Sequence, residues 1–295
     1  MNVDVSTTSR TVQGVYRGDG FHWVGDGFHV TQVIPGPANL TRLADPFLMM
    51  DYHAPYRYAP TDVPRGVGAH PHRGFETVTM AFEGSVAHHD STGAGGVIHP
   101  GDVQWMTAAR GILHKEYHEA GWAARGGTFH MMQLWVNLPA AHKMDDPGYQ
   151  GLTAGEMGKV TLPGGGTVTV VAGSIHGVQG PARTCTPINL WDVRLGAGES
   201  AELAVPRRHN VMVFVLDGLV RTAGHVVEPQ RLAVFEHDGD ALHLAADVDG
   251  ARVVVLGGEP INEPVASYGP FVMNSREELV QAIEDFNAGT FGRLD

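Results

Sequence analysis

Two short segments of this chain each carry a pair of side chains of the kinds that bind metal ions. The pairs are His70 with His72 and His114 with Glu116, and one residue separates the members of each pair. In an extended strand, side chains two residues apart point to the same face. Two such strands lying side by side would direct three imidazoles and one carboxylate at one point. The sequence therefore predicts a mononuclear metal site inside a β-barrel.

This donor set limits the ion and its chemistry. Three neutral imidazoles and one carboxylate offer nitrogen and oxygen without sulfur, which suits Fe(II), Ni(II), Mn(II), Co(II) or Zn(II). In an octahedral site, four protein ligands would leave two positions open for a chelating substrate, or for a substrate and O₂. A closed tetrahedral zinc site would instead indicate a structural role.

The histidine pair has little weight by itself, because the chain has 17 histidines among 295 residues. At that frequency about one His-x-His pair is expected by chance. The context adds weight. The first pair precedes an apolar run that ends at 83–84, and the second pair follows turn signals at 100–102 and 110–111. This order places two antiparallel strands where their inner faces can meet. The competing interpretation is that all four residues are hydrogen-bonded parts of a barrel interior.

The elements that must position these residues are short strands. The chain has 39 glycines and 18 prolines, which indicates many turns and favours strands over long helices. Short β-prone runs separated by Gly, Pro and Asp turn signals suit an antiparallel barrel or sandwich. These runs are 75–82, 103–107, 112–116 and 128–136, and the third of them contains His114 and Glu116.

A second β-rich block, from 168 to about 256, repeats the pattern of the first. Residues 77–86 align with 211–220, and 100–106 align loosely with 229–235. Internal similarity of this kind indicates a duplicated domain. The second copy keeps one of the four possible ligands, so we expect a structural or gating domain without a metal. The positions corresponding to His70, His72, His114 and Glu116 are Ala204, Pro206, His243 and Ala245.

These patterns divide the chain into four parts. We expect an N-terminal metal-binding domain at 1–144, a linker rich in Gly, Asp and Pro at 145–166, and a second domain at 167–260. The remainder, 261–295, is expected to be a tail with one amphipathic helix. Ser275-Arg-Glu-Glu278 matches a helix capping box, and Gly289 is a suitable residue for the position after the last turn.

Composition excludes several classes of protein. The formal charge of −12, with no run of Lys and Arg, argues against direct contact with nucleic acid. The polar first residues lack the apolar core of a signal peptide, and no stretch approaches the roughly 18 apolar residues of a membrane span. Cys185 is the single cysteine, so no intramolecular disulfide can form. We expect a soluble, cytoplasmic protein with no membrane contact.

Three segments are long enough to suggest a family: 70–79, 100–116 and 268–274. They resemble pirin, a two-domain member of the cupin superfamily, and the resemblance runs over nearly the whole chain. It implies an all-β fold of two cupin-type antiparallel β-barrels, a bicupin, with a short C-terminal α-helix. It also implies one metal ion in the first barrel, most readily Fe(II), held by the matching residues His70, His72, His114 and Glu116.

The identity of the carboxylate ligand has one alternative. Many cupins take it four residues after the second histidine, where this chain has Glu76, and strand alternation would also point Glu76 inward. The pirin pattern uses the carboxylate two residues after the third histidine, which is Glu116. We favour Glu116 as the ligand, and Glu76 as an acceptor that orients an imidazole or a Lys or Arg partner.

The resemblance implies an activity. Proteins similar to pirin include quercetin 2,3-dioxygenases, which open the central ring of a flavonol with O₂ and release carbon monoxide. In that interpretation the substrates are an aromatic, flavonol-like molecule and O₂, and Glu116 is the catalytic base for the flavonol hydroxyl proton. Two alternatives stay open. One is a non-enzymatic metal- or redox-sensing regulator that binds a protein partner; the other is a scaffold whose metal only stabilises the barrel.

Other histidines receive a plainer interpretation. Residues 88–90, His-His-Asp, are expected to form a solvated turn. His99, His118 and His130 are expected to be ordinary hydrogen-bonded residues, and His53 is assigned no role.

Overall fold

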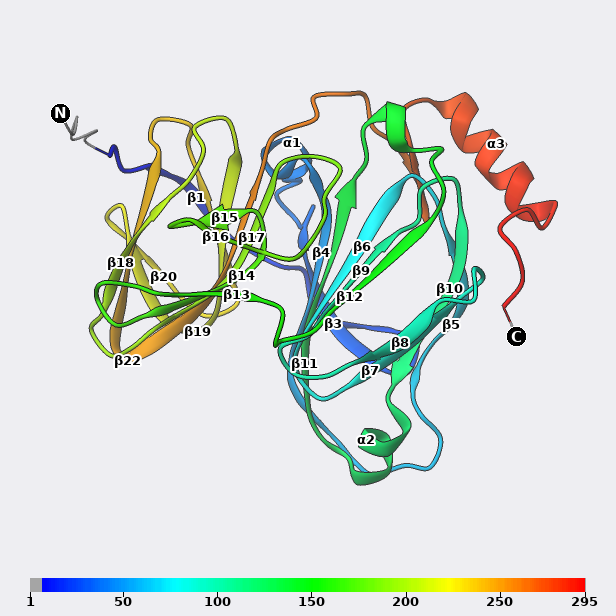
Figure 1. Cartoon of the computed structure of the whole chain (residues 1–295), viewed down its shortest axis with the longest axis horizontal. Helices are drawn as coiled ribbons and strands as arrows, with labels where there is room; N and C mark the ends of the chain where they lie inside the picture. Colours follow the sequence, from blue (N-terminus) through cyan, green and yellow to red (C-terminus); the bar gives the residue numbers. More distant parts are fainter. Residues whose placement is uncertain (1–6, 295) are drawn as a thin grey trace. The chain divides into compact units, whose positions relative to one another are not determined.

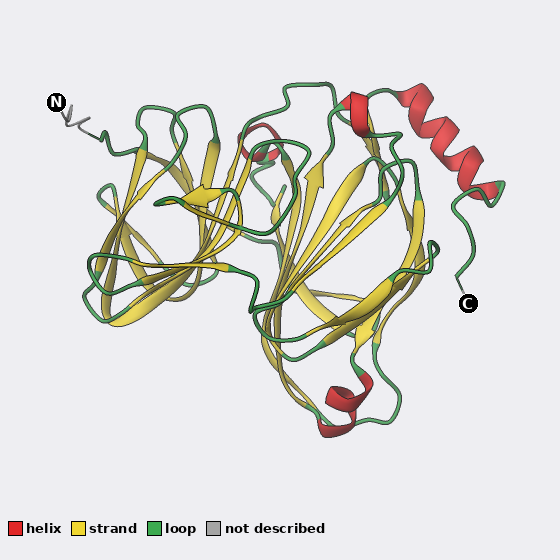
Figure 2. Cartoon of the chain, viewed as in Figure 1, coloured by secondary structure: helices red, strands yellow, loops and turns green. Residues whose placement is uncertain are grey.

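The computed structural model describes residues 7–294, and most of them lie in β-strands (Figures 1 and 2). This confirms the all-β fold expected from the turn-rich sequence. The chain divides into two compact units, and each is assembled from separate stretches of sequence. The site unit consists of Asp19–Pro35, Pro46–Glu156 and Ile261–Asp295. The apolar unit consists of Met1–Gly18, Gly36–Asp45 and Met157–Pro260.

Two antiparallel sheets form most of the site unit in the described part of the chain. In order across the larger sheet, the strands are β12 (Gly148–Leu152), β9 (Val103–Thr107), β6 (Phe75–Glu83), β11 (Gly127–Asn137), β4 (Phe47–Tyr58), β3 (Phe28–Ile34) and β2 (His22–Val24). The smaller sheet contains β5 (Gly66–His72), β10 (Ile112–His118), β7 (Val86–Asp90) and β8 (Gly95–Ile98). The expected runs 75–82, 103–107, 112–116 and 128–136 correspond to β6, β9, β10 and β11.

The burial pattern explains why these residues form strands around an interior. Along β10 every second residue is buried, from Ile112 through His114 and Glu116 to His118. Period-two burial of this kind is the pattern of a strand with one face inside. β6 is buried on both faces up to its last residue, consistent with its central place in the larger sheet.

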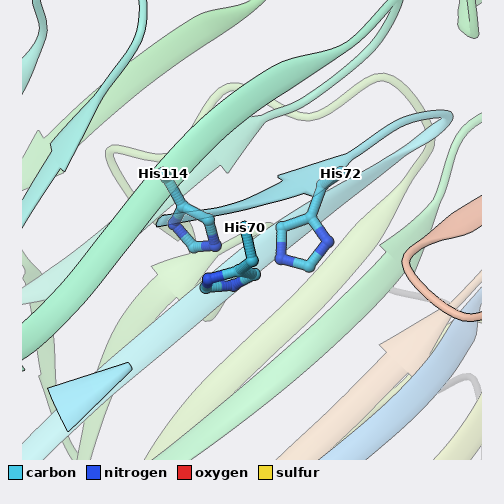
Figure 3. A group of neighbouring side chains, drawn as sticks. All are labelled: His70, His72 and His114. Atoms are coloured by element: carbon cyan, nitrogen blue, oxygen red, sulfur yellow. The ribbon is translucent and has the colours of Figure 1, made fainter. Parts of the chain in front are cut away.

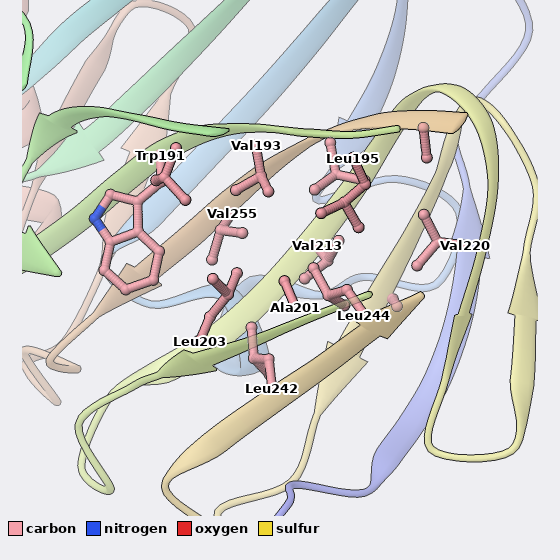
Figure 4. Close-up of a cluster of buried hydrophobic side chains, with 14 of the residues drawn as sticks. Trp191, Val193, Leu195, Ala201, Leu203, Val213, Val220, Leu242, Leu244 and Val255 are labelled. Atoms are coloured by element: carbon pink, nitrogen blue, oxygen red, sulfur yellow. The ribbon is translucent and has the colours of Figure 1, made fainter. Parts of the chain in front are cut away.

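The apolar unit contains one large antiparallel sheet among its described residues. Its strands are β1 (Val12–Arg17), β13 (Gly158–Thr161), β14 (Thr167–Ala172), β17 (Ile188–Leu195), β18 (Ser200–Ala204), β19 (Asn210–Thr222), β20 (His225–Val227), β21 (Arg231–Phe235) and β22 (Ala241–Gly258). A short pair, β15 (Ser174–Ile175) with β16 (Val178–Gln179), lies beside them. Aliphatic side chains and Trp191 fill the interior, as Figure 4 shows. His243, the counterpart of His114, is half exposed and lies 3.1 Å from Glu202.

Helices are few and short. They are α1 (Thr41–Ala44), α2 (Ala120–Arg125), the 3₁₀ turn η1 (Ala140–His142) and α3 (Arg276–Asn287). The capping box at the start of α3 is confirmed, because the Glu278 amide donates to Ser275 Oγ and the Ser275 amide donates to the Glu278 carboxylate. Leu279 and Ala282 pack α3 against β24 (Phe271–Met273), which pairs with β23 (Ala266–Tyr268).

The segment 145–166 contains two strands. β12 pairs with β9 in the site unit, and β13 pairs with β14 in the apolar unit. The assignment of this segment as a linker stays a prediction. Within residues 7–294, no helix combines the length and the apolar character needed to cross a membrane.

Candidate metal centre

β5 and β10 run antiparallel and bring the expected histidines together. His114 lies directly opposite His70 in this pair, and His72 lies two residues further along β5. Figure 3 shows the three imidazoles grouped at one point. One ring nitrogen from each histidine lies within 4.8 Å of the others. The i and i+2 spacing of His70 and His72, and the pairing of β5 with β10, therefore bring the three imidazoles together as strand geometry predicts.

Glu116 follows His114 on the same face of β10, although a β-bulge separates them in the pairing with β5. Glu116 lines the same cavity as His70 and His72. Oε2 of Glu116 accepts a hydrogen bond from Nε2 of Gln133 at 3.1 Å, and Oε1 lies 3.4 Å from Oγ1 of Thr79. The carboxylate is not in the 4.8 Å group that the histidines form. The structure brings Glu116 to the cavity, and its role as a ligand stays a prediction.

Burial sets the protonation state of these groups. Removal from water holds the pKa of His72 and that of His114 well below the usual imidazole value, and the neighbouring histidines lower both further. Burial raises the pKa of Glu116, against the opposing effect of His70. The two buried imidazoles are therefore neutral at pH 7 and can offer lone pairs to a cation.

Hydrogen bonding leaves several of these lone pairs available. Among the described residues, Nδ1 of His72 and both ring nitrogens of His114 are buried without a hydrogen-bond partner. His70 donates from Nδ1 to the Gly68 carbonyl at 2.8 Å, which leaves its Nε2 as the acceptor. A buried polar atom without a partner is costly, and a bound cation would remove that cost. The residues thus fit a divalent metal ion.

The spacing of the rings allows such an ion with a small adjustment. Two nitrogens bonded to one ion at about 2.1 Å can be at most about 4.2 Å apart. The ring nitrogens here lie within 4.8 Å of one another. A bound ion would therefore draw the imidazoles together by about half an ångström.

The site opens into a cavity of about 340 Å³ whose wall is mainly apolar. Gln133 and Asp51 are the polar wall residues besides His70, His72 and Glu116. Burial raises the pKa of Asp51 to about 6. A mostly apolar cavity of this size, with a few convergent polar groups, is typical of a small-molecule site. The remaining wall residues are Val24, Phe28, Val30, Met49, Val67, Met131, Trp135 and Pro270.

Comparison with known proteins gives the family. Residues 27–136 match the family model described as Pirin, and residues 190–292 match the one described as Pirin C-terminal cupin domain. The chain belongs to the pirin family. The family resemblance predicted from three sequence segments is confirmed, and so is the bicupin fold of two cupin domains with the C-terminal helix α3.

The relatives described here match most of this pirin-family chain. A Pseudomonas aeruginosa protein named "Putative quercetin 2,3-dioxygenase" is 48% identical over 285 residues, which cover 96% of this chain and 99% of that protein. A "Pirin-like protein" of Caulobacter vibrioides is 42% identical and covers 90% of this chain and 94% of its own. The crystal structure of a quercetin 2,3-dioxygenase from Acinetobacter baumannii is 43% identical, covers 98% of this chain and 100% of its own, and has a TM-score of 0.93.

The expected inward orientation of Glu76 is wrong. A turn at 73–74, whose glycine has a φ of 88°, interrupts the alternation that begins at the histidine pair. In β6 it is Thr77 that lies opposite the cavity residue Trp135, so Glu76 lies on the other face of the sheet. There it accepts a hydrogen bond from Thr107 at 2.7 Å, and burial raises its pKa to about 7.

The expectation of a solvated turn at 88–90 is also wrong. These residues lie in β7, which pairs with β10 on one side and β8 on the other. The His88 side chain is fully buried opposite Glu116, with Nε2 2.7 Å from the Tyr149 hydroxyl. His118 is a hydrogen-bonded residue as expected, and its Nε2 lies 2.9 Å from the Gly27 carbonyl oxygen.

The sequence predicts none of the other wall residues, which include Asp51, Gln133, Trp135 and Pro270. Gln133 and Trp135 occupy alternate positions of an expected strand, so parity could have placed them on the inner face. No local pattern marks Asp51. Pro270 reaches the cavity through the pairing of the next residue, Phe271, with Arg73, a contact that the local sequence does not encode.

Proposed function

We propose that this protein is a metal-dependent flavonol 2,3-dioxygenase of the quercetin type, acting with O₂ at a mononuclear centre. The ligands in this proposal are His70, His72, His114 and Glu116. The observation that carries it is the convergence of three imidazoles beside a mainly apolar cavity; two of them, His72 and His114, are buried and have ring nitrogens without partners. The names of the relatives from P. aeruginosa and A. baumannii support the choice of a flavonol as substrate.

The histidines and Glu116 would hold a divalent ion, Fe(II) in first place, with Ni(II), Mn(II), Co(II) or Zn(II) as alternatives. Such an ion supplies Lewis acidity toward a flavonol hydroxyl and, where the metal allows it, redox chemistry toward O₂. The hydrogen bond from His70 to Gly68 fixes one imidazole tautomer before any ion binds.

Glu116 is the proposed catalytic base. Its burial raises its pKa, which makes the carboxylate a stronger proton acceptor than an exposed glutamate. The hydrogen bonds from Gln133 and Thr79 hold the carboxylate in one orientation on the cavity wall. Glu116 would accept the flavonol hydroxyl proton and retain it while the central ring is opened.

The rest of the cavity would bind and shield the substrate. Phe28, Met131 and Trp135 provide an apolar surface for flat aromatic rings and exclude water from the reacting atoms. Asp51 also lines this cavity and would accept a hydrogen bond from a phenolic hydroxyl of the substrate. This arrangement favours a polyhydroxylated aromatic molecule over an aliphatic one.

The direct test is turnover by protein stripped of metal and reloaded with one metal at a time. Quercetin in aerated buffer should lose its flavonol absorbance and release carbon monoxide only with loaded protein. No turnover with iron, nickel, manganese or cobalt would remove the proposal. Recovery of a stoichiometric protein partner from native extract, without turnover, would instead favour the metal- or redox-sensing regulator.

A further inference from the structure

The turn that follows His72 is fastened to a distant part of the chain. We call residues 270–291, which contain β24 and α3, the strap. The Arg73 amide donates to the Pro270 carbonyl at 3.3 Å, and the Val272 amide donates to the Arg73 carbonyl at 3.0 Å. Gly74 permits this approach, because a Cβ there would collide with the Val272 carbonyl oxygen. The end of β5 is therefore joined to the strap by backbone hydrogen bonds.

Lys143 reinforces the same junction from inside. Its side chain is 1% exposed, and Nζ donates to the carbonyl oxygens of Gly74 at 2.6 Å and Val272 at 3.1 Å. Its third hydrogen bond goes to Oδ1 of Asn137 at 2.7 Å. The ammonium group thus bridges the turn after β5, the strap and the end of β11.

The Arg73 side chain ties the strap to the turn before β10. Nε donates to the Arg110 carbonyl at 2.6 Å, and a terminal nitrogen lies 2.8 Å from Oδ2 of Asp285 in α3. The guanidinium group also lies 4.7 Å from the centre of the Phe291 ring. Because Arg73 is 4% exposed, these contacts are shielded from solvent.

The strap also contacts the strand that carries His114. The Phe291 ring packs on Gly111, where a Cβ would lie 2.5 Å from a ring carbon. Leu113 packs against the apolar cluster that Phe291 shares with α3 and β24. Ser91 Oγ donates to the Phe291 carbonyl at 2.6 Å and accepts from the Leu113 amide at 3.0 Å. Both ligand-bearing strands are thus held by one segment.

Pro270 brings the strap into the cavity itself. It is part of the cavity wall, and its backbone carbonyl lies close enough to the His72 imidazole to oppose, in part, the lowering of that ring's pKa by burial. A carbonyl acceptor behind a ligating imidazole fixes the ring's tautomer and orientation. The strap therefore touches the candidate site directly as well as through the strand ends.

We propose that the strap is a positioning element of the metal centre, with Asp285 and Lys143 as positioning residues that act through the turn after His72. The strap holds the turn after β5 against the start of β10 and aims the His72 ring. This inference rests on the metal centre of the proposed function and on no property of the flavonol or of O₂. Substitutions that remove contacts of the strap should weaken metal binding while the protein remains folded.

The test compares single variants of the full chain. Asp285→Asn removes one charge from the ion pair with Arg73, and Lys143→Met removes the buried ammonium group. Glu284→Gln is the matched control, because Glu284 is the neighbouring carboxylate on α3 and is exposed. Cobalt(II) and nickel(II) are the probes, with dissociation constants from chelator competition and the visible spectrum of bound cobalt. Circular dichroism confirms that each sample is folded at the temperature used.

Asp285→Asn and Lys143→Met should raise the metal dissociation constant about tenfold and change the cobalt spectrum. Glu284→Gln should match wild type, and Asp285→Glu should restore most of the affinity. A lower unfolding temperature with unchanged affinity and spectrum in Asp285→Asn would overturn the inference, even if Lys143→Met does not fold. If wild-type protein binds neither ion, the metal centre of the proposed function is rejected, and this inference is rejected with it.

Discussion

The Gln133 amide nitrogen lies 3.1 Å from Oε2 of Glu116 and connects β11 of the larger sheet to β10 of the smaller one. The bond crosses the interior at the cavity wall, so the position of the carboxylate depends on both sheets. It also stabilises the ionised form of Glu116, because it opposes the rise in the pKa that burial causes.

Glu116→Gln removes the proposed base while preserving the size of the side chain. Loss of a positioned base typically costs 10²- to 10⁴-fold in rate, so flavonol turnover should fall at least about 100-fold. Steady-state absorbance assays on metal-loaded variant and wild type measure this. Gln133→Leu should cause a smaller loss and move the acid limb of the pH–rate profile to higher pH, since the Glu116 pKa would rise. Equal rates in Glu116→Gln and wild type would reject the assigned role.

Metal removal should destabilise the protein, because His72 and His114 contain buried nitrogens without partners. A divalent ion at about 100 times its dissociation constant should raise the free energy of unfolding by about 2.7 kcal/mol. His114→Ala should abolish this increment in thermal unfolding, whereas replacement of the exposed His225 by Ala should retain it. The prediction fails if both variants respond to metal alike.

A bulkier wall residue should separate substrate binding from metal binding. Val24 lines the cavity from β2 and is partly exposed, so Val24→Trp should place its larger side chain in the cavity space. We expect a rise in KM for quercetin of at least about tenfold, with an unchanged metal dissociation constant. Val63→Trp, at a position that is 76% exposed, is the matched control. A similar KM in the two variants would show that the flavonol binds elsewhere.

Acid should destabilise the site unit through a buried histidine. Burial lowers the pKa of His53 to about 4, whereas an unfolded histidine titrates near 6.5. Between these values the unfolded chain binds a proton that the folded chain does not. The free energy of unfolding therefore falls as the pH drops from about 6.5 to about 4, by up to about 3 kcal/mol for this residue. Urea unfolding of metal-free His53→Gln should show a weaker dependence over this interval, while His225→Gln should follow wild type.

Strand alternation predicted the histidine cluster because each pair lies within one uninterrupted strand. The same rule failed for Glu76, because the turn at 73–74 contains a glycine in the left-handed region and resets the alternation. The turn predicted at 88–90 is wrong because adjacent polar residues are typical of turns, whereas here strands on both sides bury His88 and Asp90. Strand alternation therefore predicts the orientation of side chains only within one uninterrupted strand.

The residues that support the site could not be predicted from local sequence. Lys143 and Asp285 lie far along the chain from His72, and their roles depend on which segments meet in space. The family resemblance indicated the fold and the candidate ligands, but it did not indicate the hydrogen bonds that converge on the turn after β5. Those contacts join residues far apart in the chain, and the periodicity of the sequence does not encode them.

The pairing of β1 with β21, in which Val12 lies opposite Phe235, has a consequence for biosynthesis. A ribosome releases the chain from its amino end, so β1 emerges early and has no partner strand until the region around 235 has followed it. The segment 261–295 likewise joins residues of the site unit that were made much earlier. Neither unit can therefore complete its set of contacts until a segment far along the chain has been made.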